Sequence, residues 1–462
     1  MISKNKTTLF NIASTFLLQG LAFISGPIFS GALGTENYGI AAVYLTWVQV
    51  ASAAFSLQAA GTVSVARVYF PLEEQPQYQS SVLSLATIIY TSFSVLTILV
   101  TLILKNFVTL NLHMILLGLF HGWGLCVVGF MNNKFTYEFK ADKNFILSVA
   151  VSALTIGCSI LLIRVFPKDE NYWGRIIGQS SIYTIIGLII FIYILKTGKV
   201  FYKKEYWKFT LPIALPTVFH VLSHILLNQS DRVMLQSMVG NSAAGIYSLA
   251  CTFGAVLSSI WSALNNSWVP FYYEYTRRGQ IAEMKKHAKN YIELFTVLAI
   301  GFILLSREVF HVYAKSEFWE GTDLIPLFSI GYYFVFLYSF PVNFEFYNKK
   351  TKTIAIGTTA TAIFNIILNY FLIRWNGILG AVIATGVAHA ALFVFHLFRA
   401  RRLKVEEEFP FKTKEFMPGF IVVCAVCIFY WFTRNIWYIR WGIAVVLGIY
   451  ELWKMIRRKE IF

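Results

Sequence analysis

The sequence predicts an all-α polytopic membrane protein with about fourteen transmembrane helices, built as two parallel six-helix lobes followed by two C-terminal helices. Three observations predict this fold class. The 462 residues are 57% hydrophobic and only 13% charged, whereas a soluble domain usually carries about 25% charged residues. Apolar runs of about 20 residues, the length that crosses a bilayer, recur along the whole chain. Lys and Arg are concentrated in every second connection between these runs, as the positive-inside rule requires.

The apolar runs follow one another with short polar connections. We interpret the first run as a retained span and not as a signal peptide, because it is long and lacks a clear cleavage site. The runs near 145–163, 291–306 and 436–453 are the shortest, and their ends are the least defined. In chain order, the predicted spans lie near 9–30, 40–65, 81–104, 110–131, 145–163, 176–195, 211–229, 243–265, 291–306, 325–344, 354–373, 378–398, 417–433 and 436–453.

The basic residues predict the orientation of these spans. With the N-terminus placed inside, 29 of the 39 Lys and Arg residues fall in cytoplasmic segments and 10 in outside segments. The alternation predicts that both ends of the chain are cytoplasmic. Topology therefore accounts for the net charge of +16, and a nucleic-acid partner is not needed to explain it.

An internal repeat predicts the lobes. A shift of 206 residues aligns the segment 34–40 with 240–246, and the longer stretch 34–56 contains seven identities in 23 columns. The shift carries the end of span 1 onto the end of span 7, so the two halves would have the same orientation. Parallel repeats of this kind form transporters, with the substrate path between the halves. We expect an N-lobe at 1–200 (spans 1–6), a C-lobe at 201–400 (spans 7–12) and two appended spans at 401–462.

Several classes of protein are excluded by what the sequence lacks. No outside connection is long enough to hold the chemistry of a glycan polymerase or ligase, so we expect no enzymatic activity. A phosphate-binding GxxxxGK loop is absent, which argues against ATP hydrolysis. The pair Cys424 and Cys427 has the spacing of a redox or metal motif, but it lies in an apolar run and is interpreted as two small apolar residues. We therefore expect no cofactor and no metal.

Polar side chains form stripes on several predicted spans. On span 7 they fall within an arc of about 80° at helical periodicity. Such a face lines either a water-filled cavity or an interhelical hydrogen-bonded contact, and for span 7 we favour the cavity. Span 11 carries a similar stripe that ends in Asn365 and Asn369, whereas His121, His389 and His396 are interpreted as isolated packing or interfacial residues. The span 7 stripe consists of Thr217, His220, His224, Asn228 and Asp231, with Arg232 beside it.

Acidic residues indicate the charge of the substrate. In the first six spans every Asp and Glu lies in a connection, whereas an exporter of cationic drugs would keep a carboxylate inside the membrane. Asp231 is either part of the cavity or an ion-pair partner of Arg232. Arg67 and Arg232 are basic residues at the cavity rim, although Arg67 also satisfies the positive-inside rule. An anionic substrate is therefore predicted.

Two sets of motifs resemble one family of transporters. The central set contains Ser230-Asp231-Arg232, Gly240-x4-Gly245-Ile-Tyr247, Trp268-x-Pro270 and Tyr272. The second set contains Asn365-Ile-Ile-Leu-Asn369 and Gly377-Ile-x-Gly380. The sequence is similar to bacterial oligosaccharide flippases, the O-antigen and capsule repeat-unit translocases of the polysaccharide transporter family. That family lies within the multidrug/oligosaccharidyl-lipid/polysaccharide exporter superfamily.

The resemblance implies a non-enzymatic flippase in the bacterial inner (plasma) membrane. Its implied substrate is a glycan repeat unit on undecaprenyl diphosphate, moved from the cytoplasmic to the outer leaflet by alternating access. The alternatives are a multidrug or other cation-coupled antiporter of the same superfamily, and a flippase of the lipid II or teichuronic acid type. We expect a monomer in the lipid bilayer, with a polysaccharide polymerase as a further partner. The expected substrate-binding residues are Arg67, His220, His224, Asn228, Asp231, Arg232, Trp268, Tyr272, Asn365 and Asn369, of which Trp268 and Tyr272 would either stack on sugar faces or belong to the interfacial aromatic belt.

Overall fold

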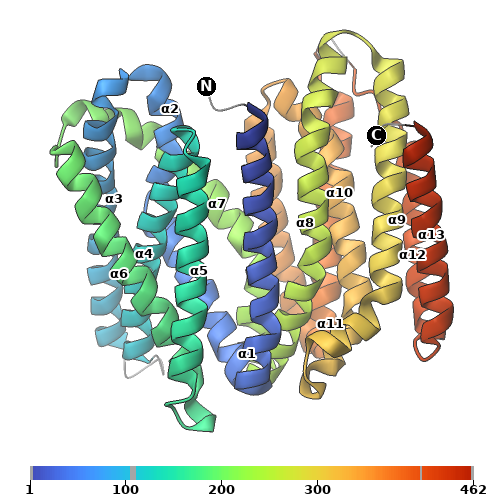
Figure 1. Cartoon of the computed structure of the whole chain (residues 1–462), viewed down its shortest axis with the longest axis horizontal. Helices are drawn as coiled ribbons and strands as arrows, with labels where there is room; N and C mark the ends of the chain where they lie inside the picture. Colours follow the sequence, from blue (N-terminus) through green and yellow to red (C-terminus); the bar gives the residue numbers. More distant parts are fainter. Residues whose placement is uncertain (1–3, 105–110, 406–407, 459–462) are drawn as a thin grey trace. The chain divides into compact units, whose positions relative to one another are not determined.

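The computed structural model describes residues 4–104, 111–405 and 408–458, with side chains described from residue 23 onward (Figure 1). Within these ranges all regular structure is helical, and no strand occurs. The all-α fold class is thereby confirmed. Contacts divide the chain into two units, residues 1–233 and 234–462, with the boundary inside one helix.

The first unit contains five long helices, most of a sixth (α7), and short connecting helices. α4 and α6 pack against each other and against α5, and α1 contacts α4, α5 and α6. The elements are α1 (Lys4–Phe55), η1 (Ala59–Gly61), α2 (Thr62–Tyr69), η2 (Leu72–Glu74), α3 (Gln75–Leu104), α4 (Leu112–Tyr137), α5 (Ala141–Ile163), η3 (Lys168–Glu170), α6 (Tyr172–Gly198) and α7 (Lys204–Met238).

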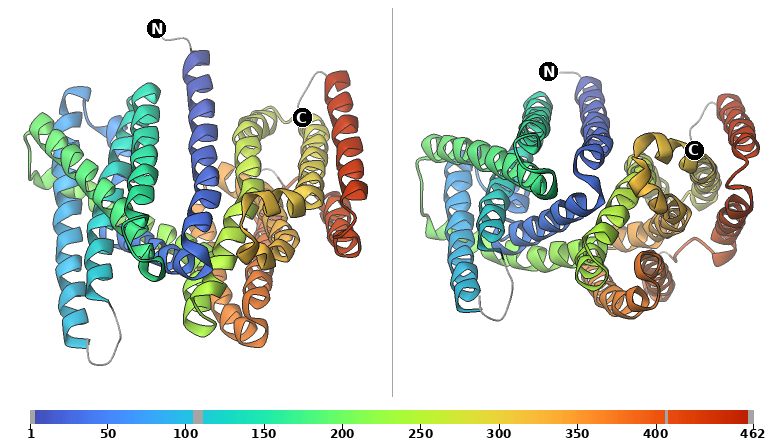
Figure 2. Two further views of the ribbon diagram at one scale, coloured as in Figure 1. Left: turned by 60° about the horizontal axis from the view of Figure 1, so that its bottom comes forward. Right: turned by 90° about the horizontal axis from the view of Figure 1, so that it is seen from below.

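α1 is two helices joined at a glycine. Gly34 has φ 71° and ψ 177°, a conformation that breaks the helical hydrogen-bond pattern and that essentially only glycine adopts. Figure 2 shows the two halves of α1 running in different directions. The predicted repeat aligns Gly34 with Gly240, which has φ 132° and ψ 173° and directly precedes α8. Two glycines with related conformations thus stand at equivalent positions, in agreement with the internal repeat.

The second predicted span ends earlier than the sequence indicates. An apolar run near 40–65 predicts one continuous helix, but α1 ends at Phe55 and α2 begins only at Thr62. Between them Leu57 and Gln58 have φ of 55° and 48°, so the chain turns away from the helix axis. The expected span over 40–65 is therefore wrong at its C-terminal end, and Arg67 lies on the separate helix α2.

The second unit contains the remaining helices. In α11, Asn376 (φ −147°) and Gly377 (φ 47°) interrupt the helix, so α11 also consists of two helices. A Cβ on Gly380 would collide with the backbone carbonyl of Leu372, which shows how closely the chain folds back at this break. The elements are α8 (Asn241–Arg277), α9 (Ile281–Tyr313), η4 (Ser316–Leu324), α10 (Ile325–Tyr347), α11 (Thr351–Arg402), α12 (Thr413–Thr433) and α13 (Trp437–Arg458).

Ten helices of the described chain are long and apolar enough to cross a membrane, by length and composition. α1 and α11 count once each in this number, although each contains two of the predicted runs on either side of its break. α9 and α13, which hold the runs near 291–306 and 436–453, are not among the ten. The count of fourteen spans and the orientation of the ends stay predictions.

Two sets of contacts fix the last helix of each unit. In the first unit, Trp207 of α7 donates from Nε1 to the backbone carbonyl of Ser81 on α3 at 3.0 Å. The Tyr78 and Thr210 hydroxyls of the same two helices lie 2.9 Å apart. In the second unit, α13 packs on α9 through the buried Arg440, which forms an ion pair with Glu308. α7 and α13 are therefore anchored by polar contacts in addition to apolar packing.

Candidate functional site

The polar face of α7 changes from exposed to buried along the helix. His220 and His224 are exposed, and Asn228 is half-buried and donates from Nδ2 to the His224 carbonyl at 2.7 Å. One turn later Asp231 is 1% exposed and accepts a hydrogen bond on Oδ1 from the backbone N–H of Arg232 at 2.8 Å. The stripe predicted from the sequence is therefore accessible only in its first part.

A polar network that the sequence analysis missed connects α7 with α1. Its central residue is Gln229, which accepts on Oε1 from the Arg232 guanidinium and from the Thr46 hydroxyl, each at 3.1 Å. The amide of Gln229 donates to Oε1 of Gln49. Gln229 lies outside the arc of the predicted stripe, and its partners on α1 are about 180 positions away in the sequence. The repeat of polar residues at 46 and 49 within an apolar run was the one available signal.

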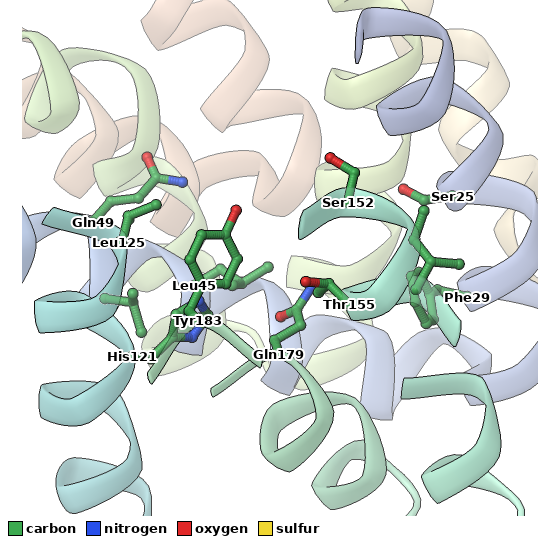
Figure 3. A pocket seen from close by; sticks show the side chains of 12 residues that line it. Ser25, Phe29, Leu45, Gln49, His121, Leu125, Ser152, Thr155, Gln179 and Tyr183 are labelled. Carbon is green, nitrogen blue, oxygen red and sulfur yellow. The ribbon is translucent and has the colours of Figure 1, made fainter. Parts of the chain in front are cut away.

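Gln49 also lines a cavity inside the first unit. The cavity has a volume of about 220 Å³, and α1, α4, α5 and α6 contribute its walls. Figure 3 shows His121, Tyr183 and Gln49 on one side of this space and Thr155, Gln179, Ser152 and Ser25 on the other. The lining residues are Ser25, Phe29, Leu45, Val48, Gln49, His121, Leu125, Ser152, Thr155, Ile156, Gln179 and Tyr183.

The lining of this cavity is polar but contains no carboxylate. Seven of the lining side chains carry hydroxyl, amide or imidazole groups, and none is Asp or Glu. Oγ1 of Thr155 and Oε1 of Gln179 are buried and have no hydrogen-bond partner within the described part of the chain. Because an unpaired buried polar group costs about 1–3 kcal/mol, polar groups left in this state commonly bind water or a ligand.

His121 belongs to the wall of this cavity. From its sequence context His121 is interpreted as an isolated packing or interfacial residue; its burial agrees with packing, and the structure adds that it packs in the cavity wall. Its Nδ1 lies 3.3 Å from the Tyr44 hydroxyl, and its ring centroid is 4.9 Å from that of Tyr183. The side chain is 2% exposed and held in place by these two aromatic residues. A sequence-based argument had no signal for it, since no other polar residue follows His121 at helical spacing on its face.

Two arginines are connected to the lining of this cavity, one directly and one through another side chain. Arg232 reaches Gln49 through Gln229. Arg175, at the start of α6, is 7% exposed, and its guanidinium lies 4.5 Å from the ring centroid of Phe29. By the positive-inside count Arg175 is one of the 10 basic residues of the outside segments. Cation–π contacts of this kind stabilise a guanidinium beside aromatic rings.

Arg67 does not line this cavity. It lies in the last turn of α2, half-buried, with its guanidinium 5.7 Å from the ring of Phe139 in the α4–α5 connection. Arg67 is therefore not among the residues that line the cavity.

The expected residues of the second unit are buried in its packing. Trp268 and Tyr272 are each 1% exposed and belong to the apolar core, where Trp268 stacks on Tyr291 at 5.3 Å between ring centroids. Asn365 and Asn369 are fully buried in α11. Asn369 donates to Asn365 at 3.0 Å, and Asn365 donates to Oγ1 of Thr385 across the α11 break at 3.4 Å. Of these two bonds only the one to Thr385 joins two helices, so the stripe of span 11 takes part in an interhelical contact, the second interpretation that its spacing allowed.

A buried acid–histidine pair is also present in the second unit. Nδ1 of His396 on α11 lies 3.0 Å from both carboxylate oxygens of Glu345 on α10. His396 was interpreted from the sequence as isolated, and this contact corrects that interpretation. Among the described residues, no group of three or more His, Cys, Asp or Glu side chains is arranged to hold a metal ion.

Membrane-length helices in two units, with a polar cavity inside the first, define the class of multi-pass membrane transporters. Residues 5–276 match the family described as "Polysaccharide biosynthesis protein". Because the match covers more than half of the chain, the chain belongs to this family, and the resemblance inferred from its motifs is confirmed. It is a multi-pass membrane protein of the bacterial inner membrane.

Relatives and solved structures agree with this assignment. A protein of the Lsg locus of Haemophilus influenzae is 22% identical over 345 residues, which cover 72% of this chain and 82% of the relative. The lipid II flippase MurJ, in an inward closed conformation, has a TM-score of 0.71 at 16% identity, covering 98% of this chain and 99% of that one. An inward-facing multidrug transporter of the MATE family has a TM-score of 0.55 at 14% identity, covering 85% and 97%. At these identities the two structures show a shared fold.

Proposed function

We propose that the chain is a flippase that moves oligosaccharide repeat units, linked to undecaprenyl diphosphate, from the cytoplasmic to the outer leaflet by alternating access. The observation that carries this proposal is the acid-free polar lining of the cavity in Figure 3. Hydroxyl and amide side chains both donate and accept hydrogen bonds, so they match the hydroxyl groups of a sugar. A lining without carboxylates also avoids repulsion of the anionic diphosphate.

The arginines near this cavity support an anionic substrate. Arg232 is held by Gln229, so its guanidinium is positioned before a ligand arrives. A guanidinium binds phosphate oxygens through two parallel hydrogen bonds, which makes Arg the preferred partner of diphosphates. We propose that Arg232 contacts the diphosphate and that His220, His224 and Asn228 extend this polar surface along α7. Trp268, Tyr272, Asn365 and Asn369 then act through the packing of the second unit, because each is buried.

Flipping breaks and forms no covalent bond, so the proposed activity needs no catalytic group. We propose that the chain acts as a monomer in the bilayer and that a polysaccharide polymerase consumes the flipped repeat units. The matched family, polysaccharide biosynthesis protein, supports a role in the synthesis of surface polysaccharide.

A flipping assay in proteoliposomes tests this proposal. The substrate is a lipid-linked glycan with a fluorescent label, and the measured quantity is the fraction of label accessible to an impermeant reagent over time. We expect the protein to equilibrate the label between leaflets. Arg232→Gln should slow flipping about tenfold or more, since a hydrogen bond to a charged group contributes about 1.5–3 kcal/mol. The matched control is Arg278→Gln, because Arg278 is exposed in the α8–α9 turn and pairs with Glu274, away from the cavity lining.

Three outcomes would count against the proposal. An unchanged leaflet distribution in the presence of the protein would reject flipping. Equal slowing by Arg232→Gln and Arg278→Gln would reject the assigned role of Arg232. Faster movement of lipid II or of a cationic drug in parallel vesicles would favour the lipid II-type flippase or the multidrug antiporter.

A further inference from the structure

A second cleft in the first unit lies away from the cavity described above. Its volume is about 450 Å³, and it forms where the end of α4, the start of α5 and the end of α6 meet, beside the start of α3. It shares no lining residue with the cavity of Figure 3. The lining residues are Pro76, Met131, Lys134, Phe135, Glu138, Lys140, Lys143, Ile189, Ile190, Tyr193 and Thr197.

One side of this cleft is cationic. Lys134 is 7% exposed, and its ammonium bonds to Gln79 and lies 3.0 Å from Oε1 of Glu138. The ammonium of Lys140 lies 2.6 Å from Oε2 of the same carboxylate. Lys143, at the start of α5, is exposed and also lines the cleft. The lining thus contains three Lys side chains and one Glu side chain, and it carries a net positive charge.

The other side of the cleft is apolar and open to the surroundings. Ile189 and Tyr193 on α6 are 62% and 51% exposed, respectively, and Met131 and Phe135 on α4 complete this wall. α4 and α6 are both membrane-length helices, so the apolar wall lies beside the acyl chains of a bilayer. The lysines stand at the helix ends, where the lipid headgroups begin.

We propose that this cleft is a binding site for an anionic glycerophospholipid of the leaflet that the α4–α5 connection faces. The phosphate lies against Lys140 and Lys143, and an acyl chain lies along Ile189 and Tyr193. Basic pockets between transmembrane helices at the membrane surface bind acidic headgroups in this way. A zwitterionic lipid would offer the same acyl contacts, but its own cation would oppose the lysines. Soluble phosphate would lack the apolar contacts.

Thermal unfolding of the full-length protein in detergent tests this proposal. The added probes are phosphatidylglycerol, phosphatidylcholine with the same acyl chains, and glycerol phosphate. We expect phosphatidylglycerol to raise the unfolding temperature at much lower concentration than the other two probes. The variant Lys140→Gln/Lys143→Gln should bind phosphatidylglycerol roughly 25-fold more weakly, at about fivefold for each lysine. Lys134 is left unchanged because it is buried, and its loss would disturb the fold.

The matched control is Lys285→Gln/Lys286→Gln on α9, a second pair of lysines with partly exposed side chains. Its affinity for phosphatidylglycerol should equal that of the unchanged protein. Equal stabilisation by phosphatidylglycerol and phosphatidylcholine would overturn the proposal, as would equal weakening by both double variants. Stronger stabilisation by glycerol phosphate, or by a polyprenyl phosphate at the same mole fraction, would reject the assignment to a glycerophospholipid. None of these outcomes depends on whether the chain flips a lipid-linked glycan.

Discussion

Glu345 and His396 form a buried pair in which Nδ1 of the histidine lies 3.0 Å from each carboxylate oxygen. The two side chains are 1% and 0% exposed, respectively, and they connect α10 to the second half of α11. Nε2 of His396 is also buried and has no hydrogen-bond partner within the described part of the chain. The stability of the α10–α11 contact therefore depends on the Glu345 carboxylate, which is the partner of Nδ1.

The destabilisation caused by replacing this carboxylate should depend on whether the new side chain can still accept a hydrogen bond from His396. Glu345→Ala leaves both nitrogens of the buried imidazole without a partner and should lower the free energy of unfolding by about 3–5 kcal/mol. Glu345→Gln keeps an acceptor for Nδ1–H and should cost clearly less. Unfolding of the purified protein in mixed micelles measures both values. Equal losses for the two variants would show that the contact with His396 does not stabilise the fold.

Gly357 should not tolerate a larger side chain, because His396 and Phe395 pack directly against it. A Cβ at this position would lie 2.5 Å from Nε2 of His396 and 2.7 Å from Cε1 of Phe395. Overpacking of this kind costs about 1–3 kcal/mol, so Gly357→Ala should destabilise the protein. At Gly386 on the same helix, a Cβ would meet no atom within 4 Å.

Gly386→Ala is therefore the matched control for Gly357→Ala. It should stabilise the protein by about 0.5–1 kcal/mol, because alanine is the better helix former. The unfolding temperatures of the two variants should move in opposite directions. Shifts of the same sign would contradict the packing around Gly357.

Replacement of the glycine at either of the two equivalent breaks should destabilise the protein, because the backbone there has a positive φ. Gly34 (φ 71°, ψ 177°) and Gly240 (φ 132°, ψ 173°) occupy a region that side chains with a Cβ avoid. Alanine at either position should cost about 1–3 kcal/mol. Gly240 gives the cleaner test, because a Cβ there would meet no atom within 4 Å, and any loss comes from the backbone. Gly442→Ala on α13, where a Cβ also meets nothing, should show no such loss in the same unfolding measurement.

The Thr155 hydroxyl should contribute more to transport than to the stability of the fold. Its hydroxyl is buried in the cavity wall without a partner in the described chain, so Thr155→Val should leave stability unchanged or raise it by about 1 kcal/mol. Flipping of a lipid-linked glycan should nevertheless slow, because a hydrogen-bonding group is lost from the lining. The comparison is Thr101→Val: Thr101 is equally 7% exposed, but its hydroxyl bonds to the Thr97 carbonyl outside the cavity. A Thr155→Val variant with unchanged flipping would remove this residue from the proposed site.

Sequence periodicity predicted the helices and the breaks near Gly34 and Gly377, but it missed the turn at Leu57 and Gln58. The interruption at Gly34 follows from a glycine that must adopt a positive φ, and the repeat with Gly240 pointed to it. The turn at Leu57 and Gln58 has no comparable signal, since neither residue favours a positive φ. Local sequence could not show that the apolar run near 40–65 ends as a helix at residue 55, because tertiary contacts overrule propensity there.

The sequence indicated which chemical groups to expect at the candidate site, but not where in the fold the site lies. The absence of acids from the first six spans correctly indicated a lining without carboxylates. Periodicity also found the face with Asn365 and Asn369, but it could not distinguish a cavity wall from a helix contact, since both place polar groups on one face. Gln229 and the pair of Glu345 with His396 depend on partners far along the chain, which a single sequence does not reveal.

The contacts of α7 with α1 and α3 bear on how this protein is made. Ser81 and Tyr78 on α3, and Gln49 on α1, find bonding partners on a helix synthesised more than 100 residues later. While the ribosome is still translating α6, these groups lie in the membrane without those partners. The first unit is thus incomplete as a folding unit until α7 is inserted, and nascent chains that stop before α7 should be substrates for membrane quality-control proteases.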